Sequence, residues 1–525
     1  MGKILETKIN RFDGGISTSL RSGDLKSASM VANFDIFSDP NRLLPHRDLD
    51  DDTLTDYTAA NAKICKFLPA TNVAKTATLL YGLGVVTNQI YAKIFSRTMP
   101  NTAWAEVHAA NAQDTVDRDE NVFIEYKNII YGWSRVDGTN ARIWSYDIVA
   151  GTFTSSARTN ATLNAATSVI QGLVHSKDDI MYLPYNTAAG AFITKLNVAT
   201  WQTDDKAITL PTNCYISSVC EYGNYLIIAT RPRIAGGQSV IYLWDRDASL
   251  TTLSEKINWG NEELFLIEEI NGYLVGVSVL SNYSSYVYGG TVTSPRLLIK
   301  TWNGGLSGTT IVKEIMLTTG DVIINSKQKA NNLLYFILSC NINSVQYDAI
   351  FTLGITTAGI WALSVNRLLN NGTAITSCIP KGFATVGDRI YAAYTDNGTY
   401  ILERTTASGT PWASTTVAYE TIIINDGDSS LTKKLIGMEV MFDPLPAAGQ
   451  VILQYKKDEA IDDTTWTDIF TYTTDDAISH GAINIESSGA TLPEYKEIMF
   501  KIKSVGNAKI TGLKWKSEII DKQLF

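Results

Sequence analysis

The stretch 221–245, EYGNYLIIATRPRIAGGQSVIYLWD, decides how the middle of this chain is expected to fold. It opens on a polar turn at 222–224, where glycine and asparagine tolerate the positive φ of a tight reversal. The strand that follows, 225–230, is apolar on both of its alternating faces, and a second strand at 240–244 runs back after two breaks. A strand that is apolar on both faces has to lie between two layers of structure.

The same pattern of a turn followed by an apolar strand recurs along the chain. Successive turn residues are 51, 45, 48, 60 and 56 positions apart, and they are Asn128, Asp179, Asn224, Gly272, Asn332 and Asp388. Periods of this length with short strands are typical of a β-propeller, in which neighbouring blades bury both faces of each four-stranded sheet. The sequence therefore predicts a propeller of six or seven blades. The alternative is a pair of β-sandwiches whose spacings are similar by accident.

The composition favours strands over helices. The chain has 525 residues, of which 18% are charged, and its 25 tyrosines and 11 tryptophans suit packed β structure. No long amphipathic helix is visible, so we expect an all-β protein. The formal net charge is −9 and Lys and Arg form no run, which argues against tight binding of DNA.

The cysteines and the apolar segments bear on where the chain folds. Five scattered cysteines, without a CxxC pair, predict buried small side chains in a reducing cytoplasm rather than disulfides. The N-terminus lacks the apolar segment of a signal peptide. No apolar run approaches the roughly 20 residues of a membrane span. We therefore expect neither secretion nor a membrane span.

Three regions differ in pattern. Residues 1–74 do not match the repeat and are expected to form an N-terminal platform or docking segment, with a single helical turn at 27–32 and a hairpin at 33–47 around the turn 38–41. Residues 75–414 carry the repeat and are expected to form the propeller. Within residues 415–525, the segments 501–505 and 513–516 alternate strictly between apolar and polar. This pattern predicts a jelly-roll-like C-terminal β-sandwich over 415–525, with strands at 435–442, 451–456, 466–472, 482–486 and 495–503.

Tryptophans fall late in several units of the repeat. We expect them to seal one blade against the next, and the alternative is an exposed row that stacks on glycans. These tryptophans are Trp104, Trp201, Trp361 and Trp412.

No catalytic, cofactor or metal motif stands out. The four histidines lack metal-ligand spacing and are expected on the surface. Nucleophile and phosphate-loop signatures are missing, and Asp426-Gly427-Asp428 lacks the remaining ligands of a calcium loop. The adjacent carboxylates Glu262-Glu263 and Glu268-Glu269 would point to opposite faces of a strand, so neither is a ready acid/base pair. The sequence therefore predicts a protein that is not an enzyme and has no cofactor.

The N-terminal hairpin resembles the opening of one protein family. Phe12-Asp13-Gly14-Gly15-Ile16-Ser17, Asn33 before a strand, and a hairpin ending in Arg42-x-x-Pro45 look like the first segment of tail nozzle proteins of short-tailed bacteriophages. These are also called tail tubular or DNA-stabilising proteins. The resemblance covers about 35 residues, and it departs from the family pattern where Leu43-Leu44 separates the arginine from the proline.

The resemblance implies a structural virion protein, made in the host cytoplasm and placed in the tail. It implies a homo-oligomeric ring, hexameric as in that family, through which DNA passes without specific binding, with neighbouring adaptor and fibre or spike proteins. The residues expected to contact another subunit or the adaptor are Gly14, Gly15, Asn33, Phe34, Arg42 and Pro45. The acidic run expected to face the lumen is Asp48, Asp50, Asp51 and Asp52.

Two other functions fit the predicted architecture. A receptor- or glycan-binding tail protein is the first alternative, because propeller rims and sandwiches both serve that purpose. A polysaccharide-degrading propeller enzyme is the second.

Overall fold

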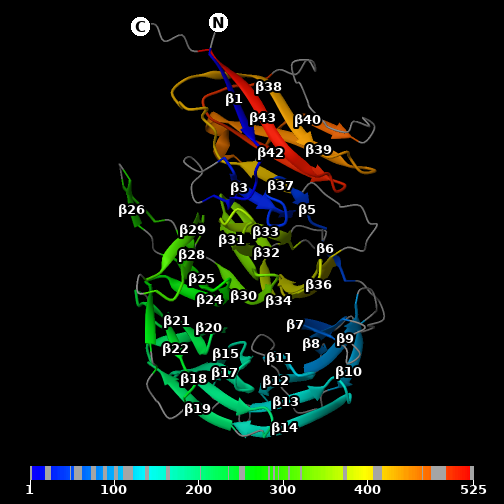
Figure 1. Ribbon diagram of the computed structural model, residues 1–525, viewed down its shortest axis with the longest axis vertical. Helices are drawn as coiled ribbons and strands as arrows, with labels where there is room; N and C mark the ends of the chain where they lie inside the picture. The colour runs from blue at the N-terminus through cyan, green and yellow to red at the C-terminus, as the bar shows by residue number, and fades with distance from the viewer. Residues whose placement is uncertain are drawn as a thin grey trace.

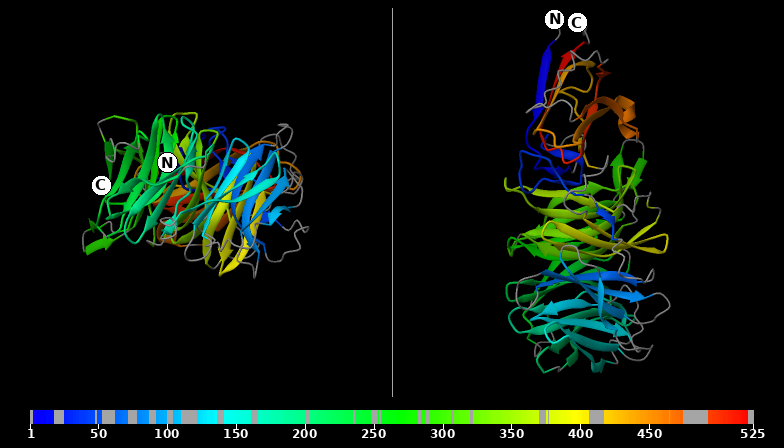
Figure 2. Two further views of the ribbon diagram at one scale, coloured as in Figure 1. Left: turned by 90° about the horizontal axis from the view of Figure 1, so that it is seen from below. Right: turned by 90° about the vertical axis from the view of Figure 1, so that its right-hand side faces the viewer.

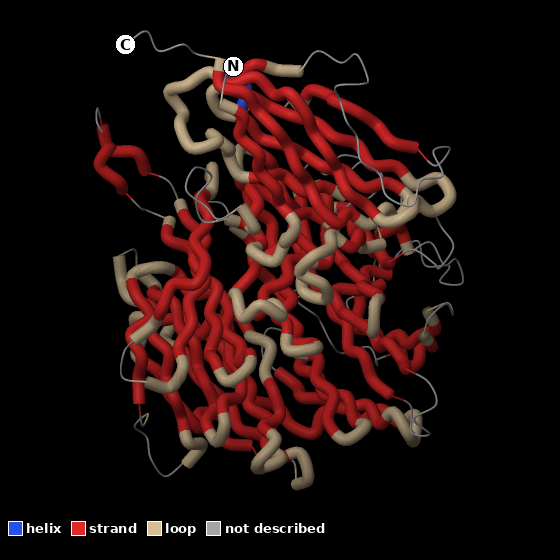
Figure 3. The backbone as a smooth tube through the Cα atoms, turned by 45° about the horizontal axis from the view of Figure 1, so that its top comes forward, coloured by secondary structure: helices blue, strands red, loops and turns tan. Residues whose placement is uncertain are grey.

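The structure is a computed structural model in which the described residues form strands and turns with one short 3-10 helix, η2 (Asp458–Asp462) (Figures 1 and 3). None of the described helical segments is long and apolar enough to cross a membrane. The described residues are 3–17, 25–47, 49–52, 62–71, 78–86, 92–99, 104–109, 122–135, 141–160, 166–200, 203–234, 236–247, 253, 255–281, 284–287, 290–293, 295–305, 308–319, 322–369, 375, 377–405, 417–463, 465–473 and 492–520.

Seven sheets follow one another around a ring in the described part of the chain (Figure 1). Each is an antiparallel meander that begins at the centre of the ring. The first four blades are β7 (Ala62–Thr71), β8 (Thr78–Val86), β9 (Ala92–Thr98) and β10 (Ala105–Ala109); β11 (Phe123–Tyr126), β12 (Ile129–Arg135), β13 (Ala141–Asp147) and β14 (Thr152–Asn160); β15 (Ala166–Val169) with β16 (Leu173–His175), β17 (Ile180–Thr187), β18 (Ala191–Asn197) and β19 (Thr203–Leu210); and β20 (Cys214–Tyr222), β21 (Tyr225–Pro232), β22 (Ser239–Trp244) and β23 (Glu255–Gly260).

The last three blades carry two additions. A small ribbon, β26 (Ser284–Val287) and β27 (Gly290–Thr293), is inserted in the fifth blade, and the outermost strand of the seventh blade comes from the N-terminal segment. These blades are β24 (Glu263–Ile270), β25 (Tyr273–Leu280), β28 (Arg296–Trp302) and β29 (Thr310–Met316); β30 (Ile323–Ala330), β31 (Leu333–Ile342), β32 (Val345–Ile355) and β33 (Trp361–Leu368); and β34 (Cys378–Val386), β35 (Arg389–Asp396), β36 (Thr399–Thr405) and β6 (Leu49–Asp51).

Apolar clusters fill the boundaries between neighbouring blades. The strand 225–230 that opened the sequence argument is part of β21, and Leu226, Ile227 and Ile228 are fully buried. Its two faces belong to different clusters, one shared with the third blade and one with the fifth. A comparable cluster lies at each of the seven boundaries between described blades. This packing confirms the predicted propeller and excludes a pair of sandwiches in this region.

The turns predicted from the repeat have the expected backbone. A residue with positive φ lies in each of them, as the Gly and Asn signals require. These residues are Asn128 (64°), Asp179 (56°), Gly223 (60°), Gly272 (81°), Asn332 (59°) and Gly387 (62°).

The ring closes because β6 completes the last blade. β6 pairs antiparallel with β36, and the innermost strand of that blade, β34, contacts β7 of the first blade. Asp52 follows β6 directly. Its Oδ2 accepts hydrogen bonds from Arg97 Nη1 at 2.6 Å and from Trp104 Nε1 at 2.9 Å, both in or beside the first blade, and its Oδ1 lies 3.3 Å from Arg404 Nε of the last blade.

A two-sheet sandwich stands on the outer edge of the sixth blade (Figure 2). One sheet has the order β1 (Ile4–Ile9), β43 (Ile510–Ile519), β38 (Lys433–Phe442) and β41 (Glu494–Tyr495). The other has β3 (Ser27–Ala32), β37 (Ala418–Thr421), β42 (Ile498–Val505), β39 (Gln450–Lys457) and β40 (Thr467–Thr473), and β2 (Gly15–Ile16) pairs with β3. Ala32 of β3 pairs in parallel with Val365 of β33, so the second sheet is continuous with the sixth blade.

The N-terminal segment is woven into the rest of the chain. The predicted hairpin is present as β4 (Phe34–Asp35) and β5 (Leu44–Pro45). The helical turn expected at 27–32 is wrong: these residues form β3, because the edges of β33 and β37 offer backbone partners on both sides. The division at residues 74 and 414 stays a prediction. Strands of the first segment lie in the sandwich (β1, β3), in the last blade (β6) and in the first blade (β7).

The described tryptophans of the repeat are packed between blades. Trp104 is 4% exposed and joins the cluster between the first and last blades, and Trp361 meets Tyr273 edge to face between the fifth and sixth blades. Trp201 and Trp412 lie outside the described residues. Both described side chains therefore have the sealing role predicted for them.

Candidate functional site

The innermost strands of the seven blades surround a central channel. A cavity of about 560 Å³ lies there, and its wall takes residues from every blade. This volume is within the range of roughly 300–1,000 Å³ that is usual for ligand pockets. The channel is therefore the first place to look for a function.

Four phenylalanines from four blades line this cavity. Phe67 of β7 and Phe265 of β24 are half-buried, whereas Phe123 of β11 and Phe383 of β34 are 3% and 4% exposed. Phe67 also packs against the indole ring of Trp104, with ring centroids 6.2 Å apart. Phe67 and Phe265 therefore offer ring surface to the cavity, whereas Phe123 and Phe383 are packed mainly into the blade boundaries behind it.

Three side-chain amides tie neighbouring blades together around the channel. Gln171 Nε2 donates to the Phe123 carbonyl at 2.9 Å, and its Oε1 accepts from the Phe123 N–H at 3.3 Å. Asn186 makes the same pair of bonds to the backbone of Ile216, at 3.0 and 2.8 Å. Gln328 does so with Thr385, at 3.2 and 2.7 Å. Each amide makes the pair of hydrogen bonds that a neighbouring strand would make within a sheet, and so links two blades. The wall is therefore rigid before any ligand arrives.

Three cations and no carboxylate are found among the described residues of the wall. Lys327 Nζ donates to the carbonyl of Val219 at 2.9 Å and to that of Ile267, and lies 2.8 Å from Glu268, so it joins three blades. Lys66 Nζ donates to the Lys381 carbonyl at 3.4 Å. The third cation is Arg231, at the end of β21.

The sequence held a signal for part of this wall that the repeat argument passed over. Phe123 and Phe383 each precede the turn residue of their repeat by five positions, and Phe265 precedes its turn residue by seven. These phenylalanines place a ring on three of the seven innermost strands, β11, β24 and β34. The amide partners had no such signal, because each bond joins residues of different blades.

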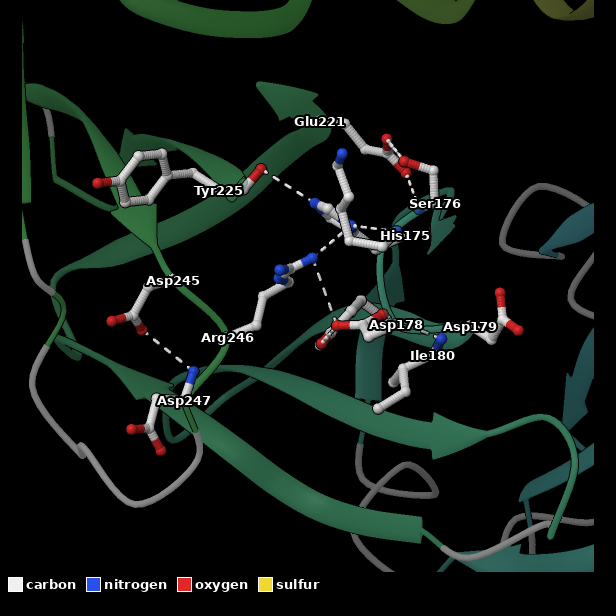
Figure 4. Close-up of polar contacts among 12 residues, drawn as sticks. His175, Ser176, Asp178, Asp179, Ile180, Glu221, Tyr225, Asp245, Arg246 and Asp247 are labelled. Carbon is white, nitrogen blue, oxygen red and sulfur yellow. Dashed lines mark hydrogen bonds and ion pairs between the residues drawn. The ribbon is translucent and has the colours of Figure 1, made fainter. Parts of the chain in front are cut away.

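A second polar cluster crosses the boundary between the third and fourth blades (Figure 4). His175 is fully buried, so the expected surface position is wrong for this histidine. Its Nε2 lies 3.4 Å from the Tyr225 carbonyl, and its Nδ1 accepts from Arg246 and from the Lys177 N–H at 3.2 Å. Arg246 lies 3.4 Å from Asp178. Burial lowers the pKa of His175, and Arg246 adds to this effect against the opposing pull of Glu221.

The arrangement around His175 fits a neutral crosslink between blades. The ring donates on one side and accepts on the other, so both nitrogens are used by the protein. In the part of the chain that the structure describes, no group of three or more His, Cys, Asp or Glu side chains is placed to hold a metal ion.

Most residues expected to contact another subunit or an adaptor are buried inside this chain. Gly14, Gly15, Asn33, Phe34 and Pro45 pack where the hairpin meets the sixth blade. The N–H of Asn33 donates to the Val365 carbonyl at 2.9 Å, and its Oδ1 accepts from the Leu368 N–H at 3.0 Å. Their visible contacts are therefore intramolecular.

Arg42 is the exception among the expected contact residues. Its side chain is 44% exposed and pairs with Asp443 of the sandwich at 3.2 Å. A docking role of the segment toward another protein stays a prediction.

The acidic run is split by the fold. Asp50 and Asp51 belong to β6, which is the outermost strand of its blade, and Asp48 lies outside the described residues. The side chain of Asp52 has no exposed surface and is enclosed by Arg97, Trp104 and Arg404. For Asp52 the expected lumen-facing position is wrong, because its carboxylate is taken up by buried cations.

Comparisons with known proteins leave the family of this chain open. No protein-family model and no curated protein match the chain. Similar solved structures include the SapL1 lectin in complex with alpha methyl fucoside (TM-score 0.34, 10% identity, covering 59% of this chain and 98% of that chain). An exo-beta-1,3-galactanase from Phanerochaete chrysosporium (0.28, 9%, 87% and 100%) and the COPII coat assembled on membranes (0.41, 11%, 67% and 48%) are also similar.

The expectation that the protein is not an enzyme is corrected by these comparisons. Enzymes that act on carbohydrates, the galactanase among them, are found among the similar solved structures. The absence of local catalytic motifs did not justify that expectation, because a propeller can assemble an active site from residues of distant blades. Membership of the tail nozzle family, a homo-oligomeric ring, adaptor and fibre or spike partners, passage of DNA and a place in the virion stay predictions.

Proposed function

We propose that the protein binds a glycan in the central channel of its propeller. The observation that carries the proposal is the wall itself: four phenyl rings from four blades line a cavity of about 560 Å³ together with amides and serine hydroxyls. Sugars present apolar C–H faces and a rim of hydroxyl groups, and such a wall offers partners for both.

The rigidity of the channel supports binding. The three amides already hold neighbouring blades at fixed spacing, so little conformational entropy is lost when a ligand enters. The matched SapL1 lectin structure contains a methyl fucoside, but the proposal for this chain rests on the residues of its own channel.

The test is glycan-array binding by the wild-type protein, followed by calorimetry with the best oligosaccharide. Phe265→Leu keeps an apolar side chain and removes the ring, and we expect affinity to fall by roughly 2- to 12-fold, from about 0.5–1.5 kcal/mol of stacking. Tyr225→Leu is the matched control, because this exposed tyrosine lies at the turn end of the fourth blade and does not line the cavity.

Two outcomes would decide against the proposal. Either no array glycan binds, or the Phe265→Leu protein binds as tightly as the wild type. Each bound polysaccharide is also assayed for new reducing ends, which would identify a degrading enzyme using the same channel.

A further inference from the structure

The charge of the channel is opposite to that of the whole chain. The protein has a formal net charge of −9, yet Lys66, Arg231 and Lys327 line the cavity and no Asp or Glu does so among the described residues. A confined wall with one sign of charge raises the local concentration of ligands of the other sign. The contrast points to an anionic ligand.

The two lysines are already used by the protein. Glu268 lies 2.8 Å from Lys327 and offsets its charge, and two carbonyls accept its remaining hydrogen bonds. Lys66 donates to a carbonyl of the seventh blade. They contribute a positive potential to the wall, and the recognition of an anion has to come from the third cation.

Arg231 and Arg233 form a natural comparison on the same ring. Both guanidinium groups lie over Tyr215, at 5.9 and 4.1 Å from its centroid. Arg233 is held by three carbonyls: Nε donates to Cys214 at 2.9 Å, Nη1 to Ala188 at 3.2 Å and Nη2 to Thr187 at 2.8 Å. Its donors are therefore committed to the fold.

The donors of Arg231 are not committed in this way. Its guanidinium also lies 5.4 Å from the centroid of Phe265, and no hydrogen bond or ion pair to another described residue engages it. The guanidinium carbon lies within 6 Å of the ring centroids of both Phe265 and Tyr215, and its N–H donors are left for a ligand. A guanidinium group suits bidentate binding of a carboxylate or sulfate group.

We propose that the glycan bound in the channel is acidic, and that Arg231 holds its carboxylate or sulfate group while Phe265 stacks on the sugar ring. This inference rests on the proposed function. It names the class of glycan and the residue that selects it.

The experiment is calorimetry with probes that differ only in charge. Digalacturonate is compared with its methyl ester, which keeps the ring and loses the anion, and a sulfated galactobiose tests the other source of negative charge. We expect an acidic probe to bind the wild type about tenfold to a hundredfold tighter than the methyl ester at low salt, as for a hydrogen-bonded charge. The better of the two acidic probes shows which anion the site takes.

Two variants with the same loss of charge identify the residue. Arg231→Gln should remove the preference for the acidic probe and leave binding of the methyl ester within about twofold. Lys127→Gln is the control, since Lys127 also lies over a tyrosine ring, at 5.0 Å from the centroid of Tyr126, but is on the surface and 65% exposed. It should keep the wild-type preference. The thermal midpoint of each variant confirms that it is folded.

The outcomes separate the two proposals. Equal binding of the acidic probe and the methyl ester would overturn the acidic class while leaving glycan binding in place. An unchanged preference in Arg231→Gln would overturn the role of that residue. Binding of adenosine monophosphate more tightly than any sugar would contradict both proposals, because the rings and the arginine would then serve a nucleotide.

Discussion

Replacing Asp52 by alanine should open the propeller at its seam. The carboxylate and the guanidinium of Arg97 have no exposed surface, and they lie 2.6 Å apart where the last blade meets the first. Arg97 is also placed over the rings of Trp104 and Tyr391, each 5.2 Å from its guanidinium carbon. Without Asp52, a buried positive charge would remain between two aromatic rings.

The expected cost follows from this burial. Removing one partner of a buried ion pair typically lowers the free energy of unfolding by about 3–5 kcal/mol, because the other charge is left without compensation. The Trp104 Nε1–H loses its acceptor as well. An exposed pair is worth roughly 0–1 kcal/mol, so Glu6→Ala, which removes a carboxylate that is 49% exposed beside Lys514, should change stability little.

The assay is urea unfolding followed by tryptophan fluorescence for the wild type, the two single variants and Asp52→Ala combined with Arg97→Leu. The combined variant should recover the part of the loss that comes from the unpaired Arg97 charge, since an apolar pair can replace a buried ion pair at little cost. If Asp52→Ala lowers stability by no more than Glu6→Ala, or if Arg97→Leu makes it worse, the argument from the buried charge is refuted.

Three further predictions test other parts of the structure. The free energy of unfolding should fall as the pH drops below 6.5, because the unfolded chain binds a proton that the buried His175 ring excludes. His175 should contribute a slope of up to about 1.4 kcal/mol per pH unit in this range, and its contribution to stability is complete above pH 6.5. Acid titration of His175→Gln should show a shallower slope. Gln328→Ala should cost roughly 1–3 kcal/mol because it leaves a buried N–H of the seventh blade unpaired, whereas the exposed Gln238→Ala should cost under about 0.5 kcal/mol in the same urea series. Gly132→Ala would overlap the indole ring of Trp144 and should lower the thermal midpoint. Gly437→Ala should not, because its Cβ would meet only the Lys516 Cβ, at an ordinary contact distance of 4.0 Å; equal midpoints would contradict the packing of the second blade.

The repeat was visible in the sequence because it is local. Each turn residue and the strand after it are neighbours in the chain, and the positive φ of Asn128 or Gly272 is a property of that turn alone. The hairpin at 33–47 was found for the same reason, from its Pro and Asn signals.

Pairings between distant residues were not predictable in this way. β6 reaches β36 across about 350 residues, and β1 pairs with β43 at the other end of the chain, so no local pattern marks either partner. The acidic residues near β6 were expected to face a lumen, yet Asp52 is enclosed by Arg97 of the first blade and Arg404 of its own blade.

The candidate site also combines features that are local in the sequence with contacts that only the fold creates. The recurring phenylalanines were readable as a pattern, but the difference between Arg231 and Arg233 depends on which carbonyls surround each guanidinium. The two residues are two positions apart on β21 or just beyond it, and their sequence context gives no reason to separate them. Only the folded chain shows that Arg233 donates its hydrogen bonds to backbone carbonyls and that Arg231 lines the channel.

A crystal structure of the protein soaked with an acidic disaccharide tests the central claim most directly. We predict density for the sugar inside the channel, with a carboxylate or sulfate oxygen within about 3 Å of the Arg231 guanidinium and a sugar face against Phe265. A sugar seated on the outer rim or in the sandwich, with the channel unchanged, would contradict the account.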